Sequence, residues 1–253
     1  MDVPASPALD RAALDGPSPA ERLDVFGGGG SGAPVSVFFH GGYWRMLDKR
    51  DFGYVANGVV PHGHVLVVVN YALLPGVRMD TLIAQCRRAV RWTCAHIEAH
   101  GGDPTRVNLF GHSAGGHITA MMLADDGTAA PDAIDPAAIT GACSLSGIFD
   151  LDPIQRCFLN DVLALGDEEV RGFSPVRLPR RIHAPLRLAV GQEEGAEYLR
   201  QSAELARAWS KPQADNPQAD NPHLWCAPGH DHFTIRAALG DPAHAVTRYA
   251  LGL

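Results

Sequence analysis

Three reactive side chains follow one another along this sequence in an order that suits nucleophilic hydrolysis. Ser113 stands between glycines in Gly-His-Ser-Ala-Gly, Glu194 follows it, and His232 comes last. A serine hydroxyl attacks a carbonyl carbon only when a base removes its proton, and the base needs an acid that orients it. The order serine, acid, histidine is the one that accompanies a serine on a strand-to-helix turn. We therefore predict Ser113 as the nucleophile, His232 as the general base and Glu194 as the acid.

The segment around Ser113 runs from a short apolar stretch, through the flanked serine, into a stretch with helical spacing. A serine on such a tight turn has a strained backbone and an exposed hydroxyl, and the glycines remove side chains that would collide with the neighbouring strand and helix. The alternative is an ordinary serine at a helix N-cap. His112 fills a variable position of the motif and is expected to be structural, and His117 falls one turn into the helix.

The base and the acid each have alternatives. His230 is the rival of His232, and His-x-His could also be half of a metal site, although no spaced set of Cys, His or Asp supplies further ligands. Glu193 and Asp150 are the rivals of Glu194, because each also lies near the end of a predicted strand. We predict no metal at this site.

The stretch His-Gly-Gly-Tyr-Trp that begins at residue 40 offers hydrogen-bond donors for a tetrahedral oxyanion. Two residues without side chains let the backbone N–H groups of Gly41 and Gly42 approach a substrate oxygen, together with the N–H group of Ala114. We expect these three groups to form an oxyanion hole. Tyr43 and Trp44 are expected to bind substrate as the walls of an aryl pocket, although Trp44 could equally be plain core packing.

The strands that would carry these side chains are short, uniformly apolar runs, which is typical of parallel strands covered on both faces. Strands are predicted at 21–26, 35–39, 65–69, 107–110, 139–145, 186–190 and 224–227, and helices at 80–99, 114–124 and 197–209, with a final helix after His232. Residues 153–184 are expected to be irregular, with short helical pieces. This alternation predicts an α/β fold with a mostly parallel, doubly wound sheet flanked by helices and with its polar clusters at the carboxyl ends of the strands.

The composition fits one large α/β domain and limits the partners. The chain has 253 residues, of which 46% are hydrophobic and 19% are charged, and its formal net charge is −7. No basic run is present, so no nucleic-acid partner is expected, and no apolar run approaches the roughly 20 residues of a membrane span. The first residues lack the features of a signal peptide. We expect a cytoplasmic protein that acts on a small-molecule substrate without a membrane partner, and the sequence leaves room for a homodimer.

The cysteines give no sign of a disulfide framework or a thiol nucleophile. Their number is odd, none forms Cys-x-x-Cys, and none lies at a strand-to-helix turn. They are expected to be buried free thiols: Cys86, Cys94, Cys143, Cys157 and Cys226.

Two segments are expected to lie outside the ordered core. Residues 1–18 are rich in Ala, Pro and Asp and are predicted to be poorly ordered. Residues 213–217 recur as 218–222, both reading Gln-Ala-Asp-Asn-Pro, within a predicted flexible loop at 211–222. This duplicated loop is interpreted as a surface loop, with the edge of a lid as the alternative, since it precedes His232.

The motifs resemble those of the α/β-hydrolase kynurenine formamidases (arylformamidases), which lie within the hormone-sensitive-lipase-like esterases. The similarity rests on His-Gly-Gly-Tyr-Trp at 40–44, Gly-His-Ser-Ala-Gly-Gly at 111–116 and Asp-His-Phe at 231–233. The segment 191–202 also matches, with the acid on Glu194, as do 146–151 and 174–175. The resemblance covers residues 35–250.

This resemblance implies an α/β-hydrolase fold in a single domain over residues 1–253, without a large cap and without a cofactor. It also implies hydrolysis of N-formyl-L-kynurenine to kynurenine and formate in tryptophan catabolism. A carboxylesterase for short-chain aryl esters is the alternative, and a non-catalytic binding protein is a more distant one. The sequence departs from the family in three ways. Glu194 stands where many members have Asp, the region before Val35 is expected to be too short for antiparallel opening strands, and the duplicated loop is foreign to the pattern.

Overall fold

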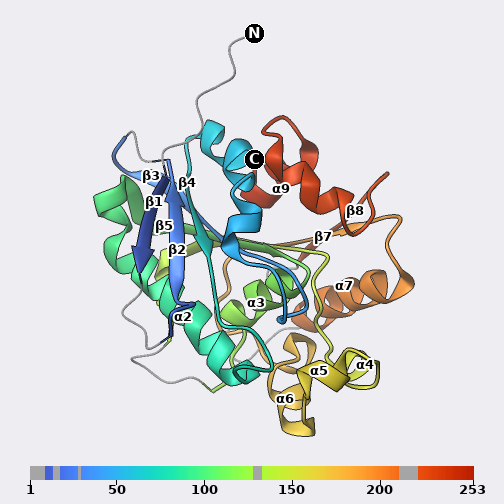
Figure 1. Ribbon diagram of the computed structural model, residues 1–253. Coiled ribbons are helices and arrows are strands. Elements are labelled where there is room, and N and C mark those ends of the chain that lie inside the picture. Colours follow the sequence, from blue (N-terminus) through green and yellow to red (C-terminus); the bar gives the residue numbers. More distant parts are fainter. Residues whose placement is uncertain (1–8, 14–17, 28–29, 128–132, 211–221) are drawn as a thin grey trace.

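A computed structural model of the chain describes residues 9–13, 18–27, 30–127, 133–210 and 222–253, which fold around one eight-stranded sheet (Figure 1). The strand order is β1-β2-β4-β3-β5-β6-β7-β8. β1 pairs antiparallel with β2, and β2 pairs antiparallel with β4. All the other neighbouring pairs in that order are parallel. The predicted mostly parallel sheet is therefore confirmed.

The elements alternate along the chain as expected for such a sheet. The strands are β1 Leu9–Ala13, β2 Arg22–Phe26, β3 Ala33–Phe39, β4 Val65–Val69, β5 Gly102–His112, β6 Ile139–Leu145, β7 Leu186–Gly191 and β8 His223–Ala227. The helices are α1 Val55–Val59, α2 Met79–His96, α3 Ala114–Leu123, α4 Asp152–Gln155, α5 Asn160–Leu163, α6 Asp167–Gly172, α7 Ala196–Trp209, α8 Thr234–Ala237 and α9 Ala245–Leu251.

The central strands are buried on both faces, which explains why they read as uninterrupted apolar runs. In β4, Val65, Val67 and Val69 pack into one apolar layer, and Leu66 and Val68 pack into the other. The first layer contains residues of α2, α3 and α7, and the second contains residues of α1, α8 and α9 (Figure 1). Successive side chains of a strand point to opposite faces, so each strand must supply apolar residues to both layers.

Two antiparallel strands open the chain, and here the sequence predictions are wrong. β1 pairs with β2 from Leu9↔Phe26 to Ala13↔Arg22, although residues 9–13 were predicted to be poorly ordered and the region before Val35 too short for such a pair. Five residues suffice for a strand. The sequence Leu-Asp-Arg-Ala-Ala has little strand propensity, so its pairing with a neighbouring strand decides its conformation. Residues 1–8 lie outside the described residues.

The other elements follow the predicted pattern closely. β4 and β6 have the predicted bounds, and the predicted strand at 21–26 is β2. α2 continues into a short 3₁₀ turn and ends at Gly101, whose φ of 82° lies in the left-handed region that glycine favours. The connection between β6 and β7 carries the short helices α4, α5 and α6 and a 3₁₀ turn at Pro175–Arg177, as the predicted irregular segment with short helical pieces requires. α1 has no counterpart in the prediction. Residues 211–221, which include nearly all of the duplicated loop, lie outside the described residues.

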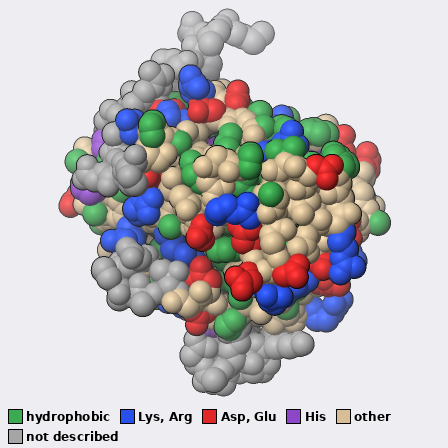
Figure 2. All heavy atoms as spheres, turned by 60° about the horizontal axis from the view of Figure 1, so that its bottom comes forward, with side chains coloured by type: hydrophobic (Ala, Val, Ile, Leu, Met, Phe, Trp, Pro, Cys, Tyr) green, Lys and Arg blue, Asp and Glu red, His purple; other side chains and the backbone are tan. Residues whose placement is uncertain are grey.

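The surface of the described residues shows no segregation of charge on the face in Figure 2. Acidic and basic side chains are interspersed there among apolar and neutral ones. No helix in the described ranges combines the length and apolar character that crossing a membrane would require.

The cysteines are free, but they do not share one environment. Cys86 and Cys143 are buried, Cys94 and Cys157 are partly buried, and Cys226 is exposed. Burial raises the pKa of Cys94 to about 11 and that of Cys143 to about 12. The prediction of buried thiols is confirmed for Cys86 and Cys143 and is wrong for Cys226, because β8 is the last strand of the sheet order and Cys226 faces outward from it.

Candidate active site

Ser113 lies on a strained turn between β5 and α3. Its backbone has φ 59° and ψ −121°, a conformation that costs a residue with a side chain of the order of 1–3 kcal/mol. The flanking glycines are sterically required. A Cβ on Gly111 would overlap the carbonyl oxygen of Gly115, and one on Gly115 would overlap that of Phe39. The turn therefore holds the serine at the carboxyl end of β5 and at the N-terminus of α3, where the helix dipole favours negative charge.

Ser113, His232 and Glu194 are joined by hydrogen bonds. Ser113 Oγ lies 3.1 Å from His232 Nε2, and His232 Nδ1 lies 2.7 Å from Glu194 Oε2. The carboxylate can only accept, so Nδ1–H donates to Glu194, and Nε2 is left to accept from the serine hydroxyl. The three residues come from the ends of β5, β7 and β8, which are parallel strands of the same sheet. The structure thus brings together the three residues predicted for the triad.

Glu194 is fixed by two further donors. Its side chain has no exposed surface. Oε1 accepts from the backbone N–H of Gly191 at 2.7 Å and from the hydroxyl of Ser146. Ser146 directly follows β6, has φ 50°, and is held by its own N–H, which donates to the carbonyl of Ala189 at 2.7 Å. With His232 included, three donors converge on this one carboxylate and set its orientation.

The alternative candidates for the acid and the base, Glu193, Asp150 and His230, take no part in this set of hydrogen bonds. The side chain of Glu193 is exposed, and Asp150 forms an ion pair with Arg177 at 2.7 Å. The ring of His230 meets the ring of His244 edge to face at a centroid distance of 5.1 Å. Within the described ranges, no group of three or more His, Cys, Asp or Glu side chains could hold a metal ion.

His112 supports the loop that carries the base. Its Nε2–H donates to the backbone carbonyl of His232 at 2.8 Å, and the centroids of the two rings lie 4.5 Å apart. Burial, more than the nearby positive charges, holds the pKa of His112 well below its usual value, so the ring is neutral. Because the His112 ring is neutral, it does not repel a positive charge that forms on the neighbouring His232 ring.

The turn after β3 lies so close to neighbouring backbone, including that around Ser113, that Gly41 and Gly42 have no room for a side chain. A Cβ on Gly41 would lie 2.9 Å from the carbonyl oxygen of His112 and 3.2 Å from Ser113 Cβ. Gly42 has φ 118°, and a Cβ there would overlap the carbonyl oxygen of Met46. The backbone of Gly41, the first of the two glycines predicted for the oxyanion hole, therefore runs beside the serine, and Gly42 follows it in a tight turn against Met46. Ala114, the third predicted donor, is the first residue of α3.

Of the two roles left open for Trp44, the structure favours core packing over the wall of an aryl pocket. Its side chain has no exposed surface, and its indole N–H donates to His117 Nδ1 at 3.1 Å. His117 Nε2–H in turn donates to the carbonyl of Phe173 at 2.8 Å, and burial lowers the pKa of His117 to about 4. This chain of bonds ties the glycine turn to α3 and to the end of α6. Tyr43, by contrast, is only partly buried.

Some residues of the site lie in segments that resemble the family but have no role predicted from the sequence. Ser146 and Gly191 bind the acid, and the phenol of Tyr198 lies over the ring of His232 with their centroids 4.4 Å apart. Tyr198 also meets Tyr43, with their hydroxyl oxygens 2.8 Å apart. Only position could have indicated them, since each lies at the end of a predicted strand or in the first turn of the helix that follows one.

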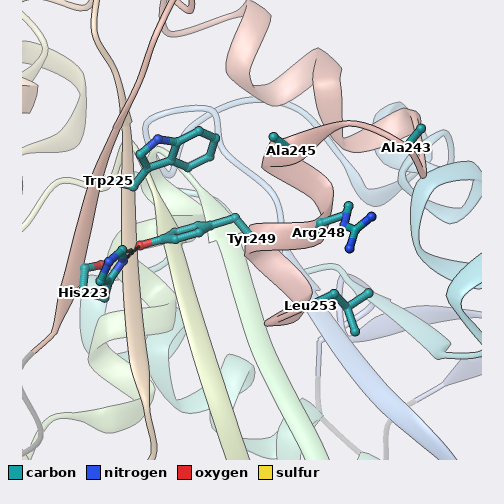
Figure 3. Close-up of a pocket in the computed structure, with 7 residues that line it drawn as sticks. All are labelled: His223, Trp225, Ala243, Ala245, Arg248, Tyr249 and Leu253. Carbon is teal, nitrogen blue, oxygen red and sulfur yellow. Dashed lines mark hydrogen bonds between the residues drawn. The ribbon is translucent and has the colours of Figure 1, made fainter.

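A separate cavity of about 410 Å³ lies between β8 and α9 (Figure 3). Its walls include His223 and Trp225 of β8 and Arg248 and Tyr249 of α9. The Tyr249 hydroxyl and His223 Nδ1 lie 2.6 Å apart. None of the predicted site residues lines this cavity, so the chemistry described above belongs to the carboxyl ends of the strands and not to this hollow.

Comparison with known proteins agrees with this geometry. The sequence profile of the BD-FAE family matches residues 25–164. A kynurenine formamidase from Danio rerio is 32% identical over 243 residues, which are 93% of this chain and 78% of that protein. The esterase LipQ from Mycobacterium tuberculosis (strain ATCC 25618 / H37Rv) is 32% identical over 133 residues, which are 48% of this chain and 30% of that protein.

Among solved structures, a protein from Silicibacter sp. TM1040 superposes with a TM-score of 0.81 and 26% sequence identity, over 95% of this chain and 85% of the other.

Proposed function

The chain belongs to the kynurenine formamidase family of α/β-hydrolases, and from this premise we propose that it hydrolyses N-formyl-L-kynurenine to kynurenine and formate with a Ser113-His232-Glu194 triad. The observation that supports the proposal most directly is the continuous set of bonds from Ser113 Oγ through the His232 ring to Glu194. All three of the segments that supply these residues, together with the glycine turn, are also segments that resemble the family.

The reaction follows from these contacts in two halves. His232 Nε2 takes the proton of Ser113 as Oγ bonds to the formyl carbon, and backbone N–H groups of the glycine turn and of Ala114 hold the oxyanion. When the C–N bond breaks, His232 returns the proton to the departing arylamine. Water then loses a proton to His232 and attacks the formyl ester. Formate leaves as the proton returns to Ser113 Oγ.

The remaining contacts serve this cycle. The carboxylate of Glu194 keeps the Nδ1–H tautomer of His232 and stabilises the imidazolium that forms in each half. Because Ser146 and Gly191 occupy Oε1, only Oε2 faces the ring. The base therefore has one orientation in which its Nε2 atom meets the serine.

Replacement of the nucleophile tests the proposal. Ser113→Ala should lower kcat by about 10⁴ or more without changing the circular dichroism spectrum, because the triad acts as a unit and the fold does not depend on the hydroxyl. A fluorophosphonate probe should label the wild-type protein at Ser113 and leave Ser113→Ala unlabelled. Wild-type activity in the variant, or a wild-type protein that resists the probe, would overturn the assignment.

A carboxylesterase for short-chain aryl esters is the second candidate, and the similarity to LipQ favours it. Both reactions use the same triad and differ in the leaving group, so the ratio of kcat/KM for N-formyl-L-kynurenine to that for p-nitrophenyl acetate separates them. We expect the ratio to favour the formamide. A higher kcat/KM for the ester, with no saturable hydrolysis of the formamide, would identify the esterase.

A further inference from the structure

The ring of His232 is the part of the site that must gain and lose a positive charge. In the proposed cycle Nε2 takes the proton of Ser113, and the charge then spreads over both nitrogens of the imidazole. Glu194 faces one of these nitrogens and Ser113 faces the other. Both of these contacts lie at the edge of the imidazole, so the environment of its faces depends on neighbouring rings.

Tyr198 of α7 turns the face of its ring, and not the edge, toward the imidazole. The two centroids lie 4.4 Å apart and the ring planes meet at 34°. Phe233, by contrast, stands nearly perpendicular to the His232 ring, with an interplanar angle of 85° and a centroid distance of 5.6 Å. The face of an aromatic ring carries negative charge and attracts a cation that lies within about 6 Å of its centroid. Tyr198 therefore offers a stabilising surface to an imidazolium at His232.

The hydroxyl of Tyr198 anchors the ring in this position. Its oxygen lies 2.8 Å from the hydroxyl oxygen of Tyr43, which belongs to the turn after β3. Tyr43 has φ 49° and follows Gly42, so the tight glycine turn sets its place. Whichever hydroxyl donates, the bond holds the far end of the phenol, and the first turn of α7 holds the near end. A ring fixed at both ends loses little further freedom when it covers the imidazole.

Other titratable or charged groups near His232 come from several elements. They are Glu194 after β7, the neutral ring of His112 at the end of β5, Asp231 in the same loop, and Arg236 of α8, whose positive charge acts on His112. All of them stay in place when the side chain at position 198 is changed. A substitution at this position therefore isolates the contribution of the aromatic ring.

We propose that Tyr198, anchored by the hydroxyl of Tyr43, positions the His232 ring and stabilises its imidazolium form by presenting an aromatic face to it. This inference rests on the proposed role of His232 as the base. The contact between the rings restricts rotation of the imidazole, so Nε2 stays directed at Ser113. The attraction is stronger for the imidazolium than for the neutral ring. It therefore favours the charged states through which both halves of the cycle pass.

Replacement of the ring tests this role. Tyr198→Leu keeps an apolar side chain but removes the aromatic face, whereas Tyr198→Phe keeps the face and removes the hydroxyl. The rate of labelling by a fluorophosphonate depends on the base and can be followed from about pH 5 to pH 9. Tyr198→Leu should lower the maximal rate about threefold and move the pH of half-maximal labelling down by about 0.5 unit, because the imidazolium loses a stabilising partner. Tyr198→Phe should keep the wild-type pH of half-maximal labelling within about 0.2 unit.

Two further variants serve as controls. A phenylalanine with three ring fluorines at position 198 keeps nearly the shape of the Tyr198→Phe side chain but has an electron-poor face. Its pH of half-maximal labelling should fall toward that of Tyr198→Leu, and this comparison holds even if the leucine variant does not fold. Tyr249→Leu removes a ring that packs against Trp225 beside the separate cavity, and it should leave the pH of half-maximal labelling unchanged.

The outcomes separate this inference from the substrate assignment, because labelling does not depend on the natural substrate. Failure of the wild-type protein to label at Ser113 would refute the proposed function. Labelling of the wild type, with the same pH of half-maximal labelling in Tyr198→Leu and in the fluorinated variant, would refute the role of the ring alone. An equal shift in Tyr198→Phe and Tyr198→Leu would refute it as well, since the effect would then belong to the hydroxyl.

Discussion

At the scale of single residues, the geometry of the site depends on hydrogen bonds that engage both carboxylate oxygens of Glu194. The carboxylate of Glu194 accepts from the Ser146 hydroxyl, the Gly191 amide and His232 Nδ1–H. His232 then has one tautomer and one orientation. A group that only accepts is required at this point, because all three of its neighbours donate.

Replacing this acid by its amide should be far more damaging than the small size of the change suggests. The glutamine side chain would bring an NH₂ group toward three donors, so at least one donor would face another. We expect Glu194→Gln to lower kcat by about 10³–10⁴, as amides do at the acid position of serine triads, with little effect on the circular dichroism spectrum. Glu193→Gln changes the exposed neighbour and should stay within twofold of wild type. A large loss in Glu193→Gln and none in Glu194→Gln would reverse the assignment of the acid.

The three residues predicted for the triad lie together in the structure, but the residues that support them were not predicted. The glycines around Ser113 and the place of His232 after the last strand form recognisable patterns. Ser146 lies in a segment that resembles the family, but nothing in that segment predicts its contact with the acid, since the contact depends on a strand pairing that brings β6 beside β7. The role of Trp44 stayed open in the sequence for a related reason. An aromatic residue next to a glycine turn can face a substrate or the core, and only the position of His117 decides between them.

At the scale of elements, the β5–α3 turn determines where the nucleophile stands. Ser113 keeps its strained backbone because the glycines allow α3 and β3 to pack directly against the turn. The backbone atoms involved belong to β3, β5 and α3, so a side chain cannot be accommodated by rotating a flexible neighbour.

Gly115→Ala should therefore destabilise the fold. Its methyl group would overlap the carbonyl oxygen of Phe39, and we expect the free energy of unfolding in urea to fall by at least about 2 kcal/mol. Gly172→Ala at the end of α6 is the control, because no atom lies within 4 Å of the added carbon, and its stability should change by no more than about 0.5 kcal/mol. Equal stability of the two variants would show that the turn relaxes freely.

The central strands of the sheet were easier to predict from the sequence than the edge strand β1. The central strands are apolar on both faces, so their bounds were predicted within two residues, except that β5 begins at Gly102, five residues before its predicted start. β1 carries charged and small residues and is a strand only because β2 offers it hydrogen bonds. The two short helices α1 and α8 also had no clear period, because helices of four or five residues are too short to show one.

At the scale of the whole molecule, several histidines are buried in the neutral form, and this makes stability depend on pH. Burial is the main reason that the pKa of His117 and that of His64 are lowered to about 4. His64 bonds through Nδ1 to the Ser36 hydroxyl at 2.9 Å. The usual pKa of histidine in an unfolded chain is about 6.5. Between these values the unfolded chain binds protons that the folded chain does not, so stability is present above pH 6.5 and is lost as the pH falls.

Each of these histidines should cost about 2 kcal/mol of stability between pH 7 and pH 4.5. His64→Asn removes one titrating group without touching the triad. The free energy of unfolding of this variant should therefore decline less steeply over that range than that of the wild type, by about 2 kcal/mol in total. The measurement is urea unfolding at half-unit steps of pH. Parallel curves for the two proteins would show that His64 takes up its proton in the folded state as readily as in the unfolded one.

The strand order also has a consequence for how the protein is made. His232 follows Ser113 by 119 residues, and the strand just before it, β8, is the last to join the sheet. A ribosome that adds about 5–20 residues per second needs roughly 6–24 s to cover that interval. During this time the nascent chain carries a serine with no base beside it. On the roles proposed for Ser113 and His232, hydrolysis can begin only after translation has released enough of the C-terminal segment for β8 to dock, so the nascent chain would be inert until then.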